Sequence, residues 1–155
     1  QVVGLIHKIL PRNNYIIRKS PNLSKESHII AANIDQAFLI VTIQFPVTTT
    51  TFIDRFLVSA EAYRIPCHLI FNKIDLYNEE QTATMNSLIE IYEMAGYQCL
   101  KISAKESIGI DELKQMMTDK TNVFSGHSGV GKSTIINSLQ SNIILKTGEI
   151  SEAHF

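Results

Sequence analysis

The chain has 155 residues, 45% of them hydrophobic and 19% charged, and its 14 basic and 15 acidic side chains give a formal net charge of −1. This composition excludes wholesale disorder and a domain that binds nucleic acid by bulk charge alone, but it leaves room for a local basic patch. No apolar run approaches the roughly 18 residues of a membrane span, so we expect no membrane partner. The length fits one domain with a fragment of a second, and we expect the sequence to be a piece of a longer protein.

The first predicted elements are two short runs of β-branched and aromatic residues, 5–10 and 14–18. We interpret them as a small β element. Residues 19–27 are polar and contain Pro21, which is typical of a linker. Residues 28–33 are a short apolar stretch that leads into the following element.

The same region holds the densest basic and aromatic stretch of the chain. Its members are Lys8, Arg12, Tyr15, Arg18 and Lys19. A contact with RNA is one interpretation of this stretch, because basic and aromatic side chains bind phosphates and stack on bases. A solvated strand face is an equally good interpretation.

From residue 37 onward, predicted strands alternate with predicted helices. Residues 37–43 are apolar except for Thr42 and rich in β-branched side chains, which fits a strand buried on both faces. The further strands are predicted over 66–72, 97–103 and 122–125, and the helices over 52–64, 82–95, 110–117 and 132–139. This alternation predicts an α/β fold with a mostly parallel sheet.

The first two helices show apolar stripes at helical spacing. The stripes consist of Phe52, Ile53, Phe56, Leu57 and Ala60 in the first helix and Met85, Leu88, Ile89 and Tyr92 in the second. We expect Thr51 to cap the first helix with Asp54 as its capping-box partner, and Gly96 to end the second. The four threonines 48–51 are interpreted as a helix cap and a polar loop.

Two cysteines, Cys67 and Cys99, lie in separate predicted strands. We interpret them as buried thiols in a reducing compartment, which predicts a cytoplasmic protein. A zinc site needs about four ligands, and two isolated cysteines do not supply them, so no zinc ligands are expected in this chain.

The strongest motif is Gly126-His127-Ser128-Gly129-Val130-Gly131-Lys132-Ser133, which matches G-x-x-x-x-G-K-[ST] between a predicted strand and a predicted helix. The glycines let backbone N–H groups point at phosphate oxygens, and the helix start adds partial positive charge. We expect Lys132 to bridge the outer phosphates and Ser133 to hold Mg²⁺, with Thr134 completing the site. A glycine-rich turn with a chance lysine is the alternative, and it does not explain why every fixed position matches.

One position inside this motif is free to vary. His127 could contact phosphate, but we favour a spacer that faces solvent.

The second motif is Asn72-Lys73-Ile74-Asp75, directly after a buried strand. The carboxyl ends of parallel strands are where α/β sheets bind ligands. A carboxylate at Asp75 would accept two donors from guanine, whereas adenine would present it with a lone pair, and such lost pairing can cost ~10⁴-fold in discrimination. The motif therefore indicates a guanine selector.

The third motif, Ser103-Ala104-Lys105, ends the predicted strand 97–103. Small side chains there let a backbone N–H approach the guanine oxygen. The tripeptide is weak evidence alone, but with the other two motifs it predicts a guanine nucleotide site.

The order of the motifs is unusual, because the base-reading segments precede the phosphate loop instead of following it. The chain has no room for a second domain that would explain this order. A circular permutation accounts for it, in which helix 110–117 runs on through 118–121 into the strand before the phosphate loop.

In this order the motifs resemble those of circularly permuted GTPases. Further stretches are similar to the bacterial RsgA/YjeQ family: Ile9-Leu10-Pro11-Arg12-x-Asn14, Ala32-Asn33-Ile34-Asp35-Gln36, Asp54-Arg55-Phe56-Leu57 and Leu145-Lys146-Thr147-Gly148-Glu149-Ile150-Ser151. The resemblance runs from about Leu5 to Glu152. It implies that residues 1–18 are the end of an amino-terminal OB-fold β-barrel, that 19–27 are a linker, and that 28–155 are a permuted P-loop GTPase domain.

The resemblance also implies a carboxyl-terminal domain with one structural Zn²⁺, outside this chain. It implies a monomeric, cytoplasmic enzyme that binds GTP and GDP with Mg²⁺ and hydrolyses GTP. Its expected partner is the small ribosomal subunit with its rRNA, which stimulates hydrolysis late in the maturation of that subunit.

No catalytic residue is assigned, because the switch segment and the D-x-x-G motif expected after Ser151 do not occur in the sequence. Two alternatives stay open. One is a permuted GTPase that acts on the large subunit, which would lack the OB-fold remnant. The other is a guanine-nucleotide-binding module that docks on RNA without hydrolysing the nucleotide.

Overall fold

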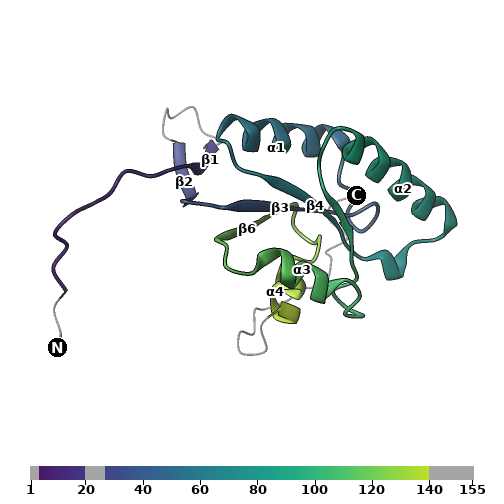
Figure 1. Ribbon diagram of the computed structural model, residues 1–155. Helices are drawn as coiled ribbons and strands as arrows, with labels where there is room; N and C mark the ends of the chain where they lie inside the picture. Colours follow the sequence, from purple (N-terminus) through teal and green to yellow (C-terminus); the bar gives the residue numbers. More distant parts are fainter. Residues whose placement is uncertain (1–3, 20–26, 140–155) are drawn as a thin grey trace.

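The computed structural model describes residues 4–19 and 27–139 (Figure 1). In chain order, the elements are the strands and helices β1 (Tyr15–Lys19), β2 (Ser27–Ala32), β3 (Gln36–Val41), α1 (Thr50–Ala62), β4 (Cys67–Phe71), α2 (Glu79–Met94), β5 (Cys99–Lys101), α3 (Ile110–Met117), β6 (Asn122–Ser125) and α4 (Lys132–Leu139), with a short 3₁₀ turn at Ile74–Leu76 between β4 and α2.

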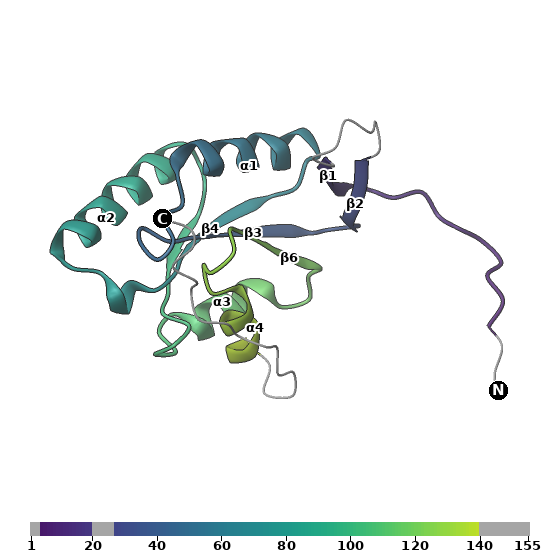
Figure 2. The ribbon, with the colours of Figure 1, turned by 180° about the vertical axis from the view of Figure 1, so that it is seen from behind.

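Four strands form a parallel sheet in the order β5-β4-β3-β6. Helices α1 and α2 cover one face and α3 and α4 the other, as the two opposite views show (Figures 1 and 2). The chain runs from β3 through β4 to β5 on the α1 and α2 side, and α3 then returns it to β6 on the far side of β3. The loops after β3 and β6 therefore lead to opposite faces, which makes this pair of strands a topological switch point.

The core lies on both sides of β3, as the apolar run predicted. Every residue of β3 is buried. Ala37, Leu39 and Val41 pack toward α1 and α2, and Phe38 and Ile40 toward α3 and α4. Because both faces of the sheet are covered, the strand needs no polar side.

The helix stripes are also confirmed, but two helix starts differ from the predictions. Helix α1 begins at Thr50 because Thr49, not Thr51, is its N-cap, with its hydroxyl accepting from the Phe52 N–H at 3.3 Å. Asp54 does not cap this helix; it accepts a hydrogen bond from the Tyr92 hydroxyl at 2.8 Å.

Helix α2 begins at Glu79, three residues before the predicted start. Asn78 and Gln81 form a reciprocal capping box, which satisfies the first free N–H groups one turn earlier than expected. The predicted end is confirmed, because Gly96 follows the helix with a φ of 91°.

The amino-terminal prediction is partly wrong. Residues 5–10 form no strand, and Leu5 and Ile6 are 75% and 83% exposed. An extended segment needs a neighbouring backbone to become a strand, and this segment has none among the described residues. β1 instead pairs antiparallel with β2, so the predicted linker 19–27 starts and ends inside strands, and its residues 20–26 lie outside the described part of the chain.

A polar cluster lies at the amino ends of the parallel strands, around the buried carboxamide of Gln36. Its Nε2 donates to the Met116 carbonyl and to Asn122 Oδ1, both at 2.7 Å. Its Oε1 accepts from Lys120 Nζ at 2.9 Å and lies 3.2 Å from His68 Nε2. This cluster fixes the connection between α3 and β6, where the proposed permutation joins the chain.

Both cysteines are free thiols; Cys67 is buried, as predicted, whereas Cys99 is only half-buried. Burial raises the pKa of Cys67 and of Cys99 to about 12. In the described residues, no helix combines the length and apolar character needed to cross a bilayer.

Candidate functional site

The three sequence motifs meet at one edge of the sheet. The phosphate loop follows β6, Asn72–Asp75 follows β4 and Ser103–Lys105 follows β5, all at the carboxyl ends of parallel strands. The predicted convergence is therefore present.

Glycines shape the phosphate loop at two close approaches. Gly126 has a φ of 146°, and a Cβ there would lie 2.8 Å from the Ile40 carbonyl oxygen. Gly131 has a φ of 97°, and its Cβ would lie 2.4 Å from Asn72 Nδ2. Between them, the Val130 side chain is fully buried in the core on the α3 and α4 side. The loop is thus held by the sheet and has no room for larger residues at these two positions.

Lys132 folds back over this loop. Its Nζ donates to the Gly126 carbonyl at 2.8 Å and to the His127 carbonyl at 2.6 Å. Burial lowers the pKa of Lys132, because the charged form loses water without gaining a carboxylate. An anion placed on the loop would supply the missing negative charge.

Asn72 joins all three motifs. Its carboxamide is buried, with Nδ2 donating to the Val130 carbonyl at 2.9 Å and Oδ1 accepting from the Ala104 N–H at 3.1 Å. Each end of one side chain therefore serves a different loop. The sequence placed Asn72 in the site without indicating this bridge.

Lys73 makes a second link to the phosphate loop. Its backbone is left-handed, with a φ of 67°, and its Nζ donates to the Gly129 carbonyl at 2.7 Å and to the Phe45 carbonyl. Burial lowers the pKa of Lys73, and the charge of Asp75 opposes the shift. Lys73 thus ties the loop after β3 to the loop after β6.

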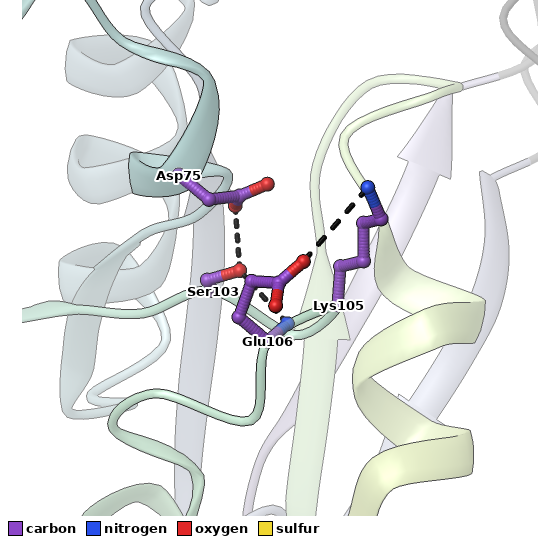
Figure 3. A network of polar contacts seen from close by, with 4 residues as sticks. All are labelled: Asp75, Ser103, Lys105 and Glu106. Carbon is purple, nitrogen blue, oxygen red and sulfur yellow. Dashed lines mark hydrogen bonds and ion pairs between the residues drawn. The ribbon is translucent and has the colours of Figure 1, made fainter.

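Three of the residues predicted to read the base, Asp75, Ser103 and Lys105, lie together with Glu106 in Figure 3. Ser103 Oγ donates to Asp75 Oδ1 at 2.5 Å and accepts from the Glu106 N–H at 3.1 Å. Asp75 is exposed, so its carboxylate is oriented by Ser103 and still accessible to a ligand. Lys105 and Glu106 form an exposed ion pair at 3.8 Å, which adds little stability. Ile74 is half-buried and donates its N–H to the Ile102 carbonyl at 3.3 Å.

Two residues at this edge were not predicted. The Tyr77 hydroxyl donates to the Asn72 carbonyl at 2.6 Å and accepts from the Ile43 N–H at 2.9 Å, and burial raises its pKa to about 12. Phe52, at the start of α1, packs its ring against that of His127 in a tilted arrangement. His127 is half-buried, so the prediction that it faces solvent is wrong. The contacts of Tyr77 with Ile43 and of Phe52 with His127 join residues that are distant in sequence, and no local pattern reveals them.

The donor set decides which groups fit this edge. The ammonium groups of Lys73 and Lys132 lie on the loop, and in the described ranges no three His, Cys, Asp or Glu side chains come together as a metal site. This arrangement suits a phosphate group and does not suit zinc. Mg²⁺ needs only a hydroxyl such as that of Ser133, in the first turn of α4, when phosphate oxygens supply other ligands.

The family described as "RsgA GTPase" matches residues 9–154. "Small ribosomal subunit biogenesis GTPase RsgA 2" of Bacteroides thetaiotaomicron is 56% identical over 97% of this chain and 49% of its own length. "Small ribosomal subunit biogenesis GTPase RsgA" of Flavobacterium johnsoniae is 59% identical over 97% of this chain and 46% of its own length. The chain thus spans about half the length of these curated relatives.

Two solved structures share the fold. YjeQ of Thermotoga maritima matches 92% of this chain and 48% of its own, with a TM-score of 0.76 and 37% identity. YloQ, described as a circularly permuted GTPase, matches 85% of this chain and 50% of its own, with a TM-score of 0.63 and 26% identity. These likenesses confirm the predicted α/β fold with a permuted order.

Proposed function

Because the chain belongs to the RsgA GTPase family, we propose that it carries the nucleotide site of a GTPase that acts in late maturation of the small ribosomal subunit. The observation that supports this most is the Asn72 bridge, which joins a phosphate-binding loop to a base-reading loop. A site for phosphate alone would need no such link.

In the proposed site, Asp75 accepts the guanine N–H donors, Ser103 orients Asp75, and the small Ala104 leaves space for the base. Lys132 and the loop N–H groups bind the phosphates, and Ser133 holds Mg²⁺, which would neutralise charge on the outer phosphates. The full set of proposed nucleotide contacts is Asn72, Lys73, Ile74, Asp75, Ser103, Ala104, Lys105, Gly126, His127, Ser128, Gly129, Val130, Gly131, Lys132, Ser133 and Thr134.

Hydrolysis forms a bond from a water oxygen to the γ-phosphorus and breaks the bond to the bridging oxygen, which gives GDP, inorganic phosphate and a proton. Lys132 is suited to offset charge that develops on the phosphate oxygens, because its ammonium already lies on the loop. Positioning of the water is a separate requirement, and no described residue is assigned to it. We therefore expect slow hydrolysis that a bound subunit accelerates.

The proposed partners follow the names of the relatives, which refer to the small ribosomal subunit. We propose a monomeric cytoplasmic protein, with residues 1–18 as the end of an OB-fold, 19–27 as a linker and 28–155 as the GTPase domain. A further domain with one structural Zn²⁺ belongs to the same proposal. The hairpin of β1 and β2 would tie the OB-fold end to the GTPase domain.

Phosphate release from GTP tests this proposal. The complete gene product is assayed alone, with purified small subunits and with purified large subunits. We expect slow release alone and much faster release with small subunits. Stimulation by large subunits only would favour a large-subunit factor, and nucleotide binding without hydrolysis under any condition would favour an RNA-docking module.

A further inference from the structure

The contact between Phe52 and His127 joins the first turn of α1 to the phosphate loop. The two ring centroids lie 3.9 Å apart with an interplanar angle of 31°, and both side chains are half-buried. Contacts between aromatic rings contribute beyond the burial of their surface. The proposed nucleotide contacts do not require such a pair.

The phosphate loop is anchored differently in its first half, residues 126–128, and in its second half, residues 129–131. The second half is held by the buried Val130 side chain and by bonds from Asn72 and Lys73 to its carbonyl groups. In the first half, Gly126 has no side chain and Ser128 is exposed. The His127 ring is therefore the side-chain anchor of that half.

The same half holds the ammonium group of Lys132. The carbonyl oxygens of Gly126 and His127 accept its two hydrogen bonds, at 2.8 and 2.6 Å. The orientation of the His127 peptide thus decides where Nζ lies. A ring that fixes His127 also fixes this acceptor.

Phe52 is a rigid partner for that ring. Its N–H donates to the Thr49 carbonyl at 3.0 Å in the first turn of α1, and its side chain packs against the core on the α1 and α2 side. The His127 ring thereby rests on a helix that is anchored independently of the loop.

We propose that Phe52 is a positioning residue, which acts through His127 to hold the first half of the phosphate loop and so presets Lys132 for phosphate. The proposal rests on nucleotide binding at this site. It extends the site to α1, outside the three motifs. A preset loop spares the nucleotide the cost of ordering it, which favours affinity.

A double-mutant cycle tests the pair in the complete gene product. Equilibrium binding of GDP and GTP is measured for wild type, Phe52→Ala, His127→Ala and the double variant. We expect each single variant to bind about two- to tenfold more weakly, as for the loss of an aromatic pair. The double variant should bind no more weakly than the worse single variant, because both changes remove one contact.

Controls separate positioning from folding. Phe56→Ala removes a half-buried ring one turn along the same helix that packs on the same core, and it should leave affinity unchanged. His127→Phe keeps a ring for the contact and should restore most of the affinity. Additive losses in the cycle, or an equal loss in Phe56→Ala, would overturn the proposal.

Lys132→Ala distinguishes the two proposals. If wild type binds no guanine nucleotide, the proposed function fails. If wild type binds and Lys132→Ala does not, while Phe52→Ala and His127→Ala bind like wild type, only the positioning role of Phe52 fails.

Discussion

At the amino ends of the parallel strands, the side chain of Gln36 has all its partners within the protein. Its Nε2 donates to the Met116 carbonyl and to Asn122 Oδ1, and its Oε1 lies within hydrogen-bond distance of Lys120 Nζ and His68 Nε2. At the carboxyl ends, Lys73 and Lys132 are held by neutral carbonyl oxygens, and no carboxylate lies within ion-pair distance of them among the described residues. Both edges are rich in polar groups. The Gln36 carboxamide finds all its partners within the protein, and Lys120 beside it is exposed to water. The carboxyl edge instead holds two half-buried ammonium groups whose charge an anion would balance.

The difference separates structural polar groups from functional ones. A buried carboxamide whose polar atoms are all hydrogen-bonded holds elements in place, and removing it costs stability. Cations held by carbonyl groups can bind a phosphate without first leaving a carboxylate. Changes at the carboxyl edge should therefore alter binding, and changes at the amino edge should alter stability.

The largest expected effect concerns Asp75. In Asp75→Asn, the amide Oδ1 can still accept from Ser103, so the local fold should persist. The lost carboxylate should weaken GDP binding and shift preference toward xanthine nucleotides, a change in discrimination of up to ~10⁴-fold. Calorimetric titration with GDP and XDP measures it, and unchanged GDP affinity would contradict the role of Asp75.

Lys132→Ala should have the next largest effect. A charge-assisted contact to phosphate is worth about 1.5–3 kcal/mol, or roughly ten- to over a hundredfold in affinity. Thermal unfolding without nucleotide should stay close to wild type, because the ammonium makes contacts only within its own loop. Normal GTP affinity in this variant would contradict the phosphate-loop assignment.

Gln36→Leu should lower the stability of the fold and leave nucleotide affinity almost unchanged. It leaves half-buried groups at Met116 and Asn122 without their partner, which costs about 1–3 kcal/mol of unfolding free energy. Urea unfolding measures this loss, with the exposed Gln98→Leu as a matched control. Nucleotide affinity should remain within about twofold of wild type. A large loss of affinity without a loss of stability would remove the distinction between the edges.

The smallest expected effect is on the pH dependence of stability, through the titration of His68. Burial, and then the charge of Lys120, lower its pKa below the usual 6.5, and its Nδ1 is buried with no partner in the described residues. The unfolded chain therefore takes up a proton near pH 6.5 that the native protein does not. The stability that neutral His68 contributes is complete above that pH and is lost as the pH falls toward the native pKa. His68→Gln should flatten this dependence in unfolding measured from pH 7.5 to 5.5.

The sequence predicted those parts of the site that depend on local pattern. The three motifs, the βαβ alternation and the helices α3 and α4 follow from spacing, glycines and hydrophobic periodicity, which act over a few residues. The start of α1 was missed because Thr49 and Thr51 are equivalent as local caps, and only the packing of the helix selects between them.

Contacts between distant segments could not be predicted in the same way. The Asn72 bridge, the ring contact between Phe52 and His127 and the Gln36 cluster each join residues separated by tens of positions in the chain. No periodicity encodes such pairs. The strand expected over 5–10 failed for a related reason, because pairing depends on a neighbour that composition does not specify.

The high pKa of Cys67 and Cys99 has a practical consequence for spectroscopy. Thiols with a pKa of about 12 are almost entirely protonated near neutral pH, and the thiolate is the form that maleimides and iodoacetamides modify. A single cysteine introduced on the exposed side of α1, such as Ser59→Cys, should therefore accept a fluorophore selectively. Neither native cysteine would need to be removed, and movements of α1 relative to the phosphate loop could be followed in an otherwise unmodified domain.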